Sequence, residues 1–219
     1  MTSRFKDLCL NTNRPGQSAD FWSTVLGLES VPNGETFVLR GDVDQHAIWL
    51  NLVPEAKTSK ARVHLDVHAA SVEEVVARGA TVLDTTNPWT VCRSPDGVEL
   101  CVFVRPPDRL PPYRLYEIGV DSVAPEKICR WWATQLGLQP QHDPDQLWWW
   151  LEGPALPFTM VFAPVPEPKQ GANWIHWDVV GSTKTYQDAG AALVRGQDDE
   201  ISWDVLTDPE GNEFCVFVQ

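Results

Sequence analysis

The stretch WTVCRSPDGVELCVFV, residues 89–104, decides the architecture, because the chain contains it again as WDVLTDPEGNEFCVFV, residues 203–218. Three further blocks recur in the same order upstream of it: FWSTVLGL at 21–28 as WWATQLGL at 131–138, VPEAK at 53–57 as VPEPK at 165–169, and RVHLDV at 62–67 as WIHWDV at 174–179. The spacing between the copies grows only slightly along the chain. Such ordered self-similarity indicates the duplication of a whole domain.

The boundary between the two copies is predicted in RPPDRLPPYR, residues 105–114, where four prolines stiffen the chain and disfavour a helix. We therefore expect a first domain over residues 1–104, a proline-rich linker over 105–112 and a second domain over 113–219.

Each copy predicts the same run of elements. In the first copy the hydrophobic periodicity and turn signals predict helices near 16–26 and 71–79, and strands near 5–12, 36–41, 46–53, 62–68, 81–84, 89–93 and 98–104. Pro15 suits a first helical turn and Gly27 suits a left-handed C-cap, as do Pro125 and Gly137 in the second copy. The expected fold is α+β, with four βαβββ modules that form two tandem domains.

The charge of the chain limits its partners. The 219 residues carry a formal net charge of −13, which disfavours nucleic acid and anionic membranes and leaves small molecules as the natural partners. No apolar run suits a signal peptide or a spanning helix, so we expect a cytoplasmic protein. The five cysteines form no CxxC pair and are expected to be free thiols.

Taken together, the repeated blocks resemble the glyoxalase-like branch of the vicinal oxygen chelate superfamily, which includes glyoxalase I, extradiol dioxygenases, and bleomycin- and fosfomycin-resistance proteins. The resemblance covers nearly the whole chain. It implies modules that form a partly open barrel around a cavity and, in metal-dependent members, a divalent ion held by the first and last strands of the modules. Single domains of this kind commonly act as dimers, which implies a monomer with pseudo-dimeric domains or a homodimer.

The resemblance places functional side chains on the first strand of each module. His64 and His176 stand where the family commonly has a metal-binding histidine, and a neutral imidazole is equally suited to acid–base chemistry. Asp7 and Glu117 stand where the superfamily often has another histidine, and a carboxylate there can bind a hard cation or act as a base. These four residues are the candidate catalytic groups. The alternatives are packing histidines and solvated strand-end carboxylates.

The last strand of each copy departs from the metal-binding pattern. Cys101 and Cys215 occupy the position where the family usually has glutamate, and the glutamates lie two residues earlier, at Glu99 and Glu213. A strand period of two puts each glutamate on the same face as its cysteine. The candidate metal ligands thus form one set in each domain, with iron, nickel, zinc or manganese as the ion. They are Asp7, His64 and Glu99 or Cys101 in the first domain, and Glu117, His176 and Glu213 or Cys215 in the second. The other interpretation is that the cysteines are small buried hydrophobic residues.

Eleven tryptophans are the other departure from usual composition. In LWWWLE, alternation should turn Trp149 away from Trp148 and Trp150. The candidate ligand-binding residues are Trp148, Trp150, Trp177 and Trp203, because indole faces stack on flat aromatic or cationic ligands. Packing between domains is the alternative role for these rings.

The leading functional hypothesis is a protein that binds a small aromatic or polycyclic metabolite in a sheet-lined cavity, either to sequester it or to transform it by acid–base chemistry without a metal. The rival is a metal-dependent lyase, isomerase or dioxygenase, in which an ion would stabilise an enolate. A third class, a purely structural interaction module, would predict no stabilisation of the fold by small molecules.

Overall fold

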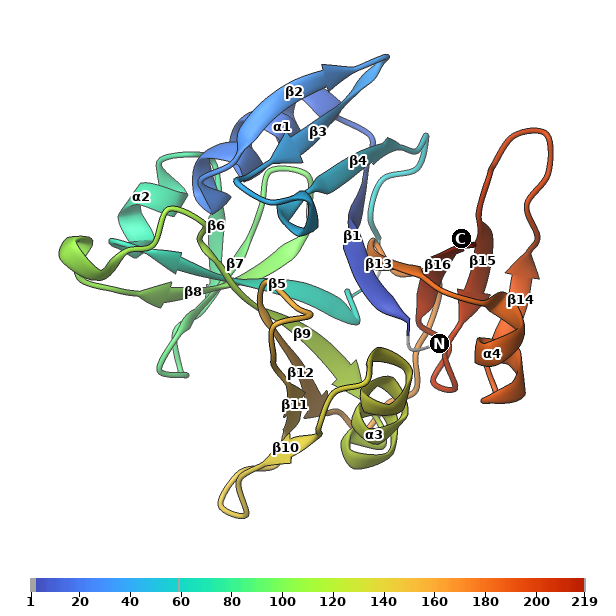
Figure 1. The fold of residues 1–219 in the computed structure, drawn as a ribbon. Helices are drawn as coiled ribbons and strands as arrows, with labels where there is room; N and C mark the ends of the chain where they lie inside the picture. The colour runs from blue at the N-terminus through green and yellow to red at the C-terminus, as the bar shows by residue number, and fades with distance from the viewer. Residues whose placement is uncertain (1–2, 59, 219) are drawn as a thin grey trace.

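The computed structural model describes residues 3–58 and 60–218, which fold into four βαβββ modules (Figure 1). The first contains β1 (Arg4–Thr12), α1 (Pro15–Leu26), β2 (Glu29–Asn33), β3 (Thr36–Arg40) and β4 (Ile48–Leu52). The second contains β5 (Val63–Ala69), α2 (Val72–Val76), β6 (Thr81–Asp84), β7 (Thr90–Arg93) and β8 (Glu99–Val104). The third contains β9 (Leu115–Ser122), α3 (Pro125–Leu136), β10 (Gln141–His142), β11 (Trp149–Leu151) and β12 (Thr159–Pro164). The fourth contains β13 (Ile175–Val180), α4 (Thr183–Asp188), β14 (Ala192–Arg195), β15 (Asp204–Thr207) and β16 (Glu213–Phe217).

The modules pair across the two repeats. One sheet, sheet A, has the strand order β14-β15-β16-β13-β1-β4-β3-β2 and joins the first module to the fourth. The other, sheet B, has the order β10-β11-β12-β9-β5-β8-β7-β6 and joins the second module to the third. In Figure 1 the blue strands therefore continue into the red ones, and the green strands into the yellow and brown ones. Antiparallel pairs β1–β13 and β5–β9 form the two junctions.

The helix signals of the sequence are confirmed, and one strand was not expected. Pro15 and Pro125 begin α1 and α3, and Gly27 and Gly137 end them with φ of 69° and 67°. The additional strand is β2, which contains Pro32 and lies at the edge of sheet A, where a missing N–H is tolerated. Among the residues described, no helix is both long and apolar enough to cross a membrane.

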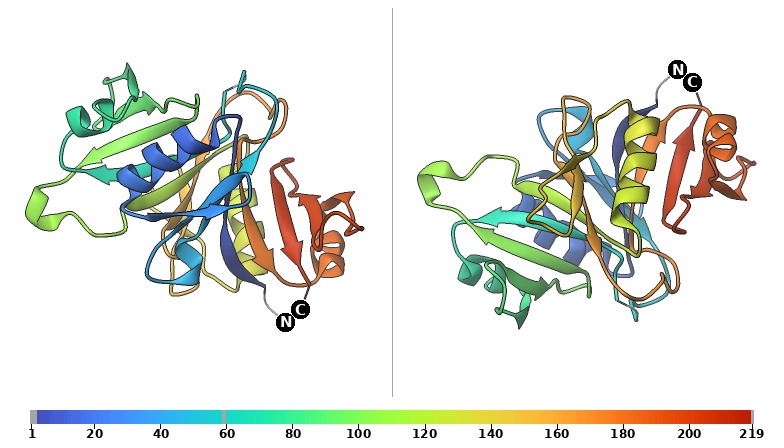
Figure 2. Two further views of the ribbon diagram at one scale, coloured as in Figure 1. Left: turned by 90° about the horizontal axis from the view of Figure 1, so that it is seen from above. Right: turned by 90° about the horizontal axis from the view of Figure 1, so that it is seen from below.

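Buried side chains from all four modules form one hydrophobic core. Each repeat is also tied across the two sheets by a hydrogen bond from a buried tryptophan to the turn before its last strand. Trp22 Nε1 on α1 donates to Asp96 at 3.3 Å, and Trp132 Nε1 on α3 donates to Asp208 at 3.1 Å. The first helix of each repeat therefore meets the turn before its last strand in space (Figure 2).

Candidate functional site

Strand alternation gives each sheet one apolar face and one face lined by polar and aromatic side chains. On β13, Trp177 is fully buried in the core, whereas His176 and Asp178 line a cavity of about 610 Å³ over sheet A. On β5, Leu65 is in the core, whereas His64 and Asp66 line a cavity of about 700 Å³ over sheet B. We call these cavity A and cavity B. Both volumes are typical of small-molecule sites.

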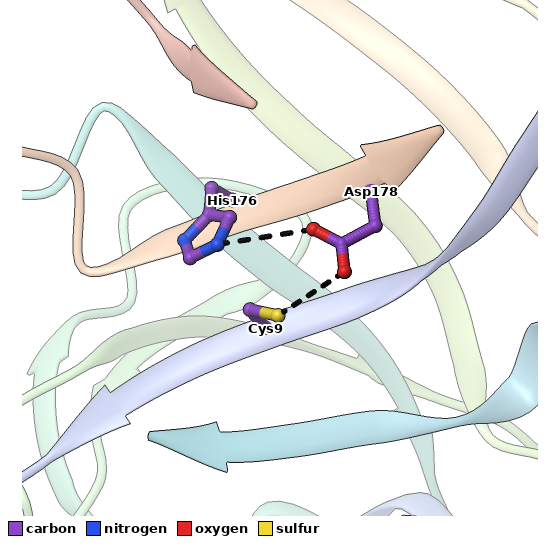
Figure 3. A group of neighbouring side chains, drawn as sticks. All are labelled: Cys9, His176 and Asp178. Carbon is purple, nitrogen blue, oxygen red and sulfur yellow. Dashed lines mark hydrogen bonds and ion pairs between the residues drawn. The ribbon is translucent and has the colours of Figure 1, made fainter. Parts of the chain in front are cut away.

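A histidine, an aspartate and a cysteine meet in cavity A (Figure 3). Asp178 Oδ1 lies 3.9 Å from His176 Nε2, and Asp178 Oδ2 lies 3.7 Å from Cys9 Sγ. Cys9 comes from β1, in register with His176 across the junction of the two repeats. Burial lowers the pKa of His176 to about 4, although the charges of Glu213 and Asp7 act in the opposite direction. His176 is therefore a neutral imidazole at physiological pH, a hydrogen-bonding group and only a weak base.

A second carboxyl group, that of Asp7, and the ammonium of Lys6 lie beside this cluster. Asp7 and Asp178 face each other across β1 and β13, and Lys6 Nζ lies 2.6 Å from Asp7 Oδ2 and 3.9 Å from Asp178 Oδ2. Trp49 Nε1 donates a further hydrogen bond to Asp7 Oδ2 at 2.9 Å. Burial and the charge of Asp7 raise the pKa of Asp178 to about 8, against the effect of Lys6. Asp178 thus holds a proton near neutral pH and can donate it.

Cavity B has the same histidine and aspartate in a closer arrangement. His64 Nε2 lies 3.2 Å from Asp66 Oδ1. Burial disfavours the charge on His64, but the charge and hydrogen bond of Asp66, with help from Cys101, raise its pKa well above the usual value. The ring lies over Gly119, the residue in register with it on β9, and a Cβ there would overlap the ring. Glycine at this position permits the close ion pair.

Glu117 is the second carboxyl group of cavity B. It is in register with Asp66 across the β5–β9 junction, as Asp7 is with Asp178 in sheet A. Burial and the neighbouring Asp66 raise the pKa of Glu117 to about 7, although a hydrogen bond with Tyr116 acts in the opposite direction. Glu117 therefore changes its charge near neutral pH, which suits a general acid or base.

Each cavity has an aromatic wall on its last strands. In cavity A the rings of Trp203 and Phe217 are stacked, with centroids 5.3 Å apart. In cavity B the rings of Trp89 and Phe103 are stacked at 5.4 Å. Trp148 adds a further indole to the wall of cavity B. These flat surfaces stand beside the ionisable clusters and suit a planar ligand.

The glutamates expected to bind a metal are engaged by neighbouring groups. Glu99 Oε2 lies 2.9 Å from Lys57 Nζ and accepts a hydrogen bond from a backbone N–H at 3.0 Å. Glu213 lies 2.8 Å from Lys169 Nζ and accepts from a backbone N–H at 3.1 Å. The last strands of the other two modules, β4 and β12, offer the cavities tryptophan, asparagine, valine and alanine side chains, none of which is acidic. The metal set expected from the resemblance therefore does not fit an ion.

Two other sets of donor atoms do gather closely enough for one. They are Cys9, His176 and Asp178 in cavity A, and His64, Asp66 and Cys101 in cavity B, with the donor atoms of each set within 4.8 Å of one another. Asp178 Oδ1 is buried without a hydrogen-bond partner in the part of the chain described. Thiolate, imidazole and carboxylate are ligands of zinc and related ions.

The grouping of site residues within each repeat, as expected from the sequence, is wrong. Asp7 lies with His176 and not with His64, while Glu117 lies with His64 and not with His176. The reason is the exchange of modules between the repeats, which completes each sheet with strands from both copies. Each cavity is thus lined by strands from both repeats.

The tryptophans fall into three classes of position. Trp148 and Trp203 line cavities B and A, respectively. Trp177 is 0% exposed and packs on Trp132 in the core, because it lies on the face of β13 opposite to His176. Trp150 is half-buried and is not part of the lining of either cavity. Trp149 points the other way from Trp148, as alternation predicts, and stacks on His142.

Sequence reasoning did not select several side chains that the structure brings to the cavities: Lys6, Trp49, Asp66, Trp89, Tyr116 and Asp178. The signal for the two aspartates was present, since HLD and HWD place each aspartate on the same face of a strand as its histidine. Lys6 and Tyr116 gave no such signal. They precede Asp7 and Glu117 and, on strict alternation, should point away.

Comparison with known proteins also identifies the two repeats. The profile of the glyoxalase-like domain matches residues 7–103 and 117–217. Glyoxalase I from Zea mays has a similar structure, with a TM-score of 0.65 and 13% identity over 98% of this chain and 92% of that one. A putative dioxygenase from Bacillus subtilis gives a TM-score of 0.63 and 11% identity over 99% and 85%. At these identities the likeness shows the fold alone. Nothing among curated proteins matches the sequence significantly.

Proposed function

Since the chain belongs to the glyoxalase-like domain family of the vicinal oxygen chelate superfamily, we propose that it binds a small planar aromatic molecule in its sheet-lined cavities. Binding serves either to sequester the molecule or to transform it by proton transfer. The division of the chain at residues 105–112 into two domains, each contributing to both cavities, is part of this proposal.

The observation that carries the proposal is the pairing of a stacked aromatic wall with a buried acid–histidine cluster. Trp203 and Phe217 line the same cavity as His176 and Asp178, and the equivalent residues line cavity B. Planar rings gain roughly 0.5–1.5 kcal/mol from a well-placed aromatic partner beyond their burial. A polar substituent of the ligand would meet the buried Asp178 Oδ1, which has no hydrogen-bond partner among the described residues.

In the catalytic version, the residues act by proton transfer. Protonated Asp178 donates a proton to an oxygen of the bound molecule and takes it back, while neutral His176 accepts a hydrogen bond from that molecule. In cavity B, Glu117 exchanges the proton while the His64–Asp66 ion pair stays fixed. In the sequestration version the same groups only provide hydrogen bonds.

The test is a titration with 2-naphthol, a planar neutral probe, followed by tryptophan fluorescence and calorimetry. Substitution Trp203→Ala should weaken binding in cavity A by roughly three- to tenfold, because the stacking surface is lost. His176→Ala should change affinity little if the cavity sequesters. Retained affinity together with loss of turnover of a substrate found later would favour catalysis. Absence of saturable binding to the wild-type chain would contradict the proposal.

A second candidate function, metal-dependent lyase, isomerase or dioxygenase chemistry, is favoured by the closely gathered donor sets. Cys9, His176 and Asp178 would hold the ion in cavity A, and His64, Asp66 and Cys101 in cavity B. Such an ion would act as a Lewis acid on a bound oxygen. Elemental analysis of protein purified without chelator tests this. Near-stoichiometric metal lost in Cys9→Ser and His176→Ala would support it, and no metal before or after add-back would exclude it.

A further inference from the structure

Asparagine distinguishes the lining of cavity A from that of cavity B. Four asparagines line cavity A: Asn11, Asn33, Asn51 and Asn173. Within the part of the chain that the structure describes, no asparagine or glutamine lines cavity B. Asn33 is exposed on the edge strand β2, and Asn173 is buried and donates from its side-chain amide to Asn212 at 3.0 Å. Asn11 and Asn51 are both half-buried and are the pair that can meet a ligand inside the cavity.

The side chains of Asn11 and Asn51 lie next to each other on the floor of cavity A. The two residues are in register on the parallel strands β1 and β4, and both line the cavity. Neighbouring strands are about 4.8 Å apart, a distance that one edge of a planar ligand can span. The side-chain amide of Asn11 forms no hydrogen bond with any residue that the structure describes. This amide is therefore free to bind a ligand.

Asn51 lies close to the ionisable cluster of cavity A. Burial raises the pKa of the Cys9 thiol, and a hydrogen bond between this thiol and Asn51 acts in the opposite direction. Cys9 is in register with His176 across the β1–β13 junction. A ligand held by the two asparagines would therefore extend over the histidine.

Cavity B has a charged and an apolar group at the two matching positions. Gly119 corresponds to Cys9, because each is in register with the histidine of its cavity. Two residues further along the same face, Asp121 takes the place of Asn11, and Ala163, in register with Asp121, takes the place of Asn51. Asp121 Oδ2 lies 2.7 Å from Lys60 Nζ. A carboxylate and a methyl group have no N–H to donate, so cavity B does not reproduce the amide pair.

The chemistry of a carboxamide defines the group that it recognises best. Its acceptor oxygen and its donor NH₂ lie side by side in one plane, and this edge can make two hydrogen bonds to a matching edge, as asparagine does with adenine. A lactam or a primary carboxamide has such an edge, because its N–H and C=O also lie side by side. A hydroxyl group has a single oxygen, which cannot meet both atoms with good geometry at once.

Resting on the proposed function, we infer that cavity A takes a planar aromatic molecule with a lactam or carboxamide edge, which the side-chain amides of Asn11 and Asn51 hold. The N–H of the ligand donates to an amide oxygen, and its carbonyl accepts from an amide N–H. The ring lies beside Trp49, two residues before Asn51 on the same face of β4, and extends toward Trp203. Cavity B takes planar molecules without this preference. The duplicated cavities thus select different classes of ligand.

The experiment compares three planar bicyclic probes: 2-quinolone, which has a lactam edge, N-methyl-2-quinolone, which lacks the N–H, and 2-naphthol, which has a hydroxyl group. The chain is labelled with 5-fluorotryptophan, so that ¹⁹F resonances of Trp49 and Trp203 report on cavity A and those of Trp89 and Trp148 on cavity B. In cavity A, 2-quinolone should bind about tenfold more tightly than either other probe, because two hydrogen bonds form only with the lactam. Cavity B should bind 2-quinolone and its N-methyl derivative about equally.

Three asparagine variants of cavity A locate the preference. Asn51→Ala, which copies Ala163 of cavity B, and Asn11→Leu, which keeps the size of the side chain, should each reduce the preference for 2-quinolone to roughly threefold or less. Both should leave the affinity for 2-naphthol nearly unchanged. Asn33→Ala is the matched control, because it removes an asparagine from the exposed part of the same cavity, and it should keep the full preference.

The possible failures separate the inference from the proposed function. Equal affinity of cavity A for the three probes, or an unchanged preference in both Asn11→Leu and Asn51→Ala, would overturn the inference and leave the proposed function standing. Equal loss of the preference in Asn33→Ala would also overturn it, because the pair would then have no special role. Failure of all three probes to bind either cavity would overturn both.

Discussion

Cavities A and B descend from the same repeated blocks, yet their histidines occupy different electrostatic states. His64 lies 3.2 Å from its aspartate, and the attraction keeps its pKa well above the usual value. His176 lies 3.9 Å from its aspartate, and burial lowers its pKa to about 4. The residue in register with each histidine on the neighbouring strand differs as well. Gly119 leaves room for the ring of His64, whereas the corresponding residue opposite His176 is Cys9. One small side chain on the neighbouring strand can thus decide the charge of a buried imidazole.

The largest effect is expected from removing the carboxyl group of Asp178 in cavity A, whose pKa is raised. With a folded-state pKa of about 8 and an unfolded value near 3.9, Asp178 binds more protons in the native chain between these limits. Stability that depends on this proton therefore falls as the pH rises from about 4 to about 8. In Asp178→Asn this dependence is absent, so the variant should gain stability relative to the wild type as the pH rises through the window, by at most about 1.4 kcal/mol per pH unit.

Urea unfolding at pH 5, 6, 7 and 8 measures this gain. Glu117→Gln is the matched variant in cavity B and should show the same sign over a narrower window, because its pKa is about 7. A constant difference between Asp178→Asn and wild type at all four pH values would show that Asp178 does not retain its proton.

The next effect tests how the residue in register with each histidine, Gly119 or Cys9, affects the pKa of that histidine. Gly119→Cys should displace the His64 ring, lengthen its ion pair with Asp66 and lower the pKa of His64 by about one unit or more. Cys9→Gly should raise the pKa of His176 by letting it approach Asp178. NMR titration of the histidine ring protons measures both.

Cys9→Ala is the control, because it keeps the Cβ while removing the thiol. If Cys9→Ala and Cys9→Gly shift the pKa of His176 equally, then the thiol and not the Cβ sets the difference between the cavities.

The smallest effect concerns the aromatic walls. Trp203→Ala should weaken 2-naphthol binding in cavity A by roughly three- to tenfold, and Trp89→Ala should do the same in cavity B. Because the cavities lie on different sheets, each variant should leave the other cavity unaffected. Calorimetry of the two variants and of the double variant tests this, and equal loss at both sites would indicate that the cavities are coupled.

The sequence predicted the modules well because their signals are local. Alternation, proline at helix starts and glycine at helix ends depend on neighbouring residues only, and they placed α1 and α3 correctly. The partnership of modules is a long-range property, so the expected pairing of Asp7 with His64 failed when β1 paired with β13. Trp177 was misjudged for a different reason, because local alternation already places it on the face of its strand opposite to His176, in the core. Lys6 and Asp7 were hard to place because the register shifts between Phe5 and Asp7.

The most direct test of the account is the ¹⁹F spectrum of the 5-fluorotryptophan-labelled chain during titration with 2-naphthol. We predict saturable shifts of Trp49 and Trp203 in cavity A or of Trp89 and Trp148 in cavity B, while the fully buried core residues Trp22, Trp132 and Trp177 stay unchanged. If none of the cavity resonances moves up to the solubility limit of the probe, or if core and cavity resonances move together, the claim that these cavities bind aromatic molecules is contradicted.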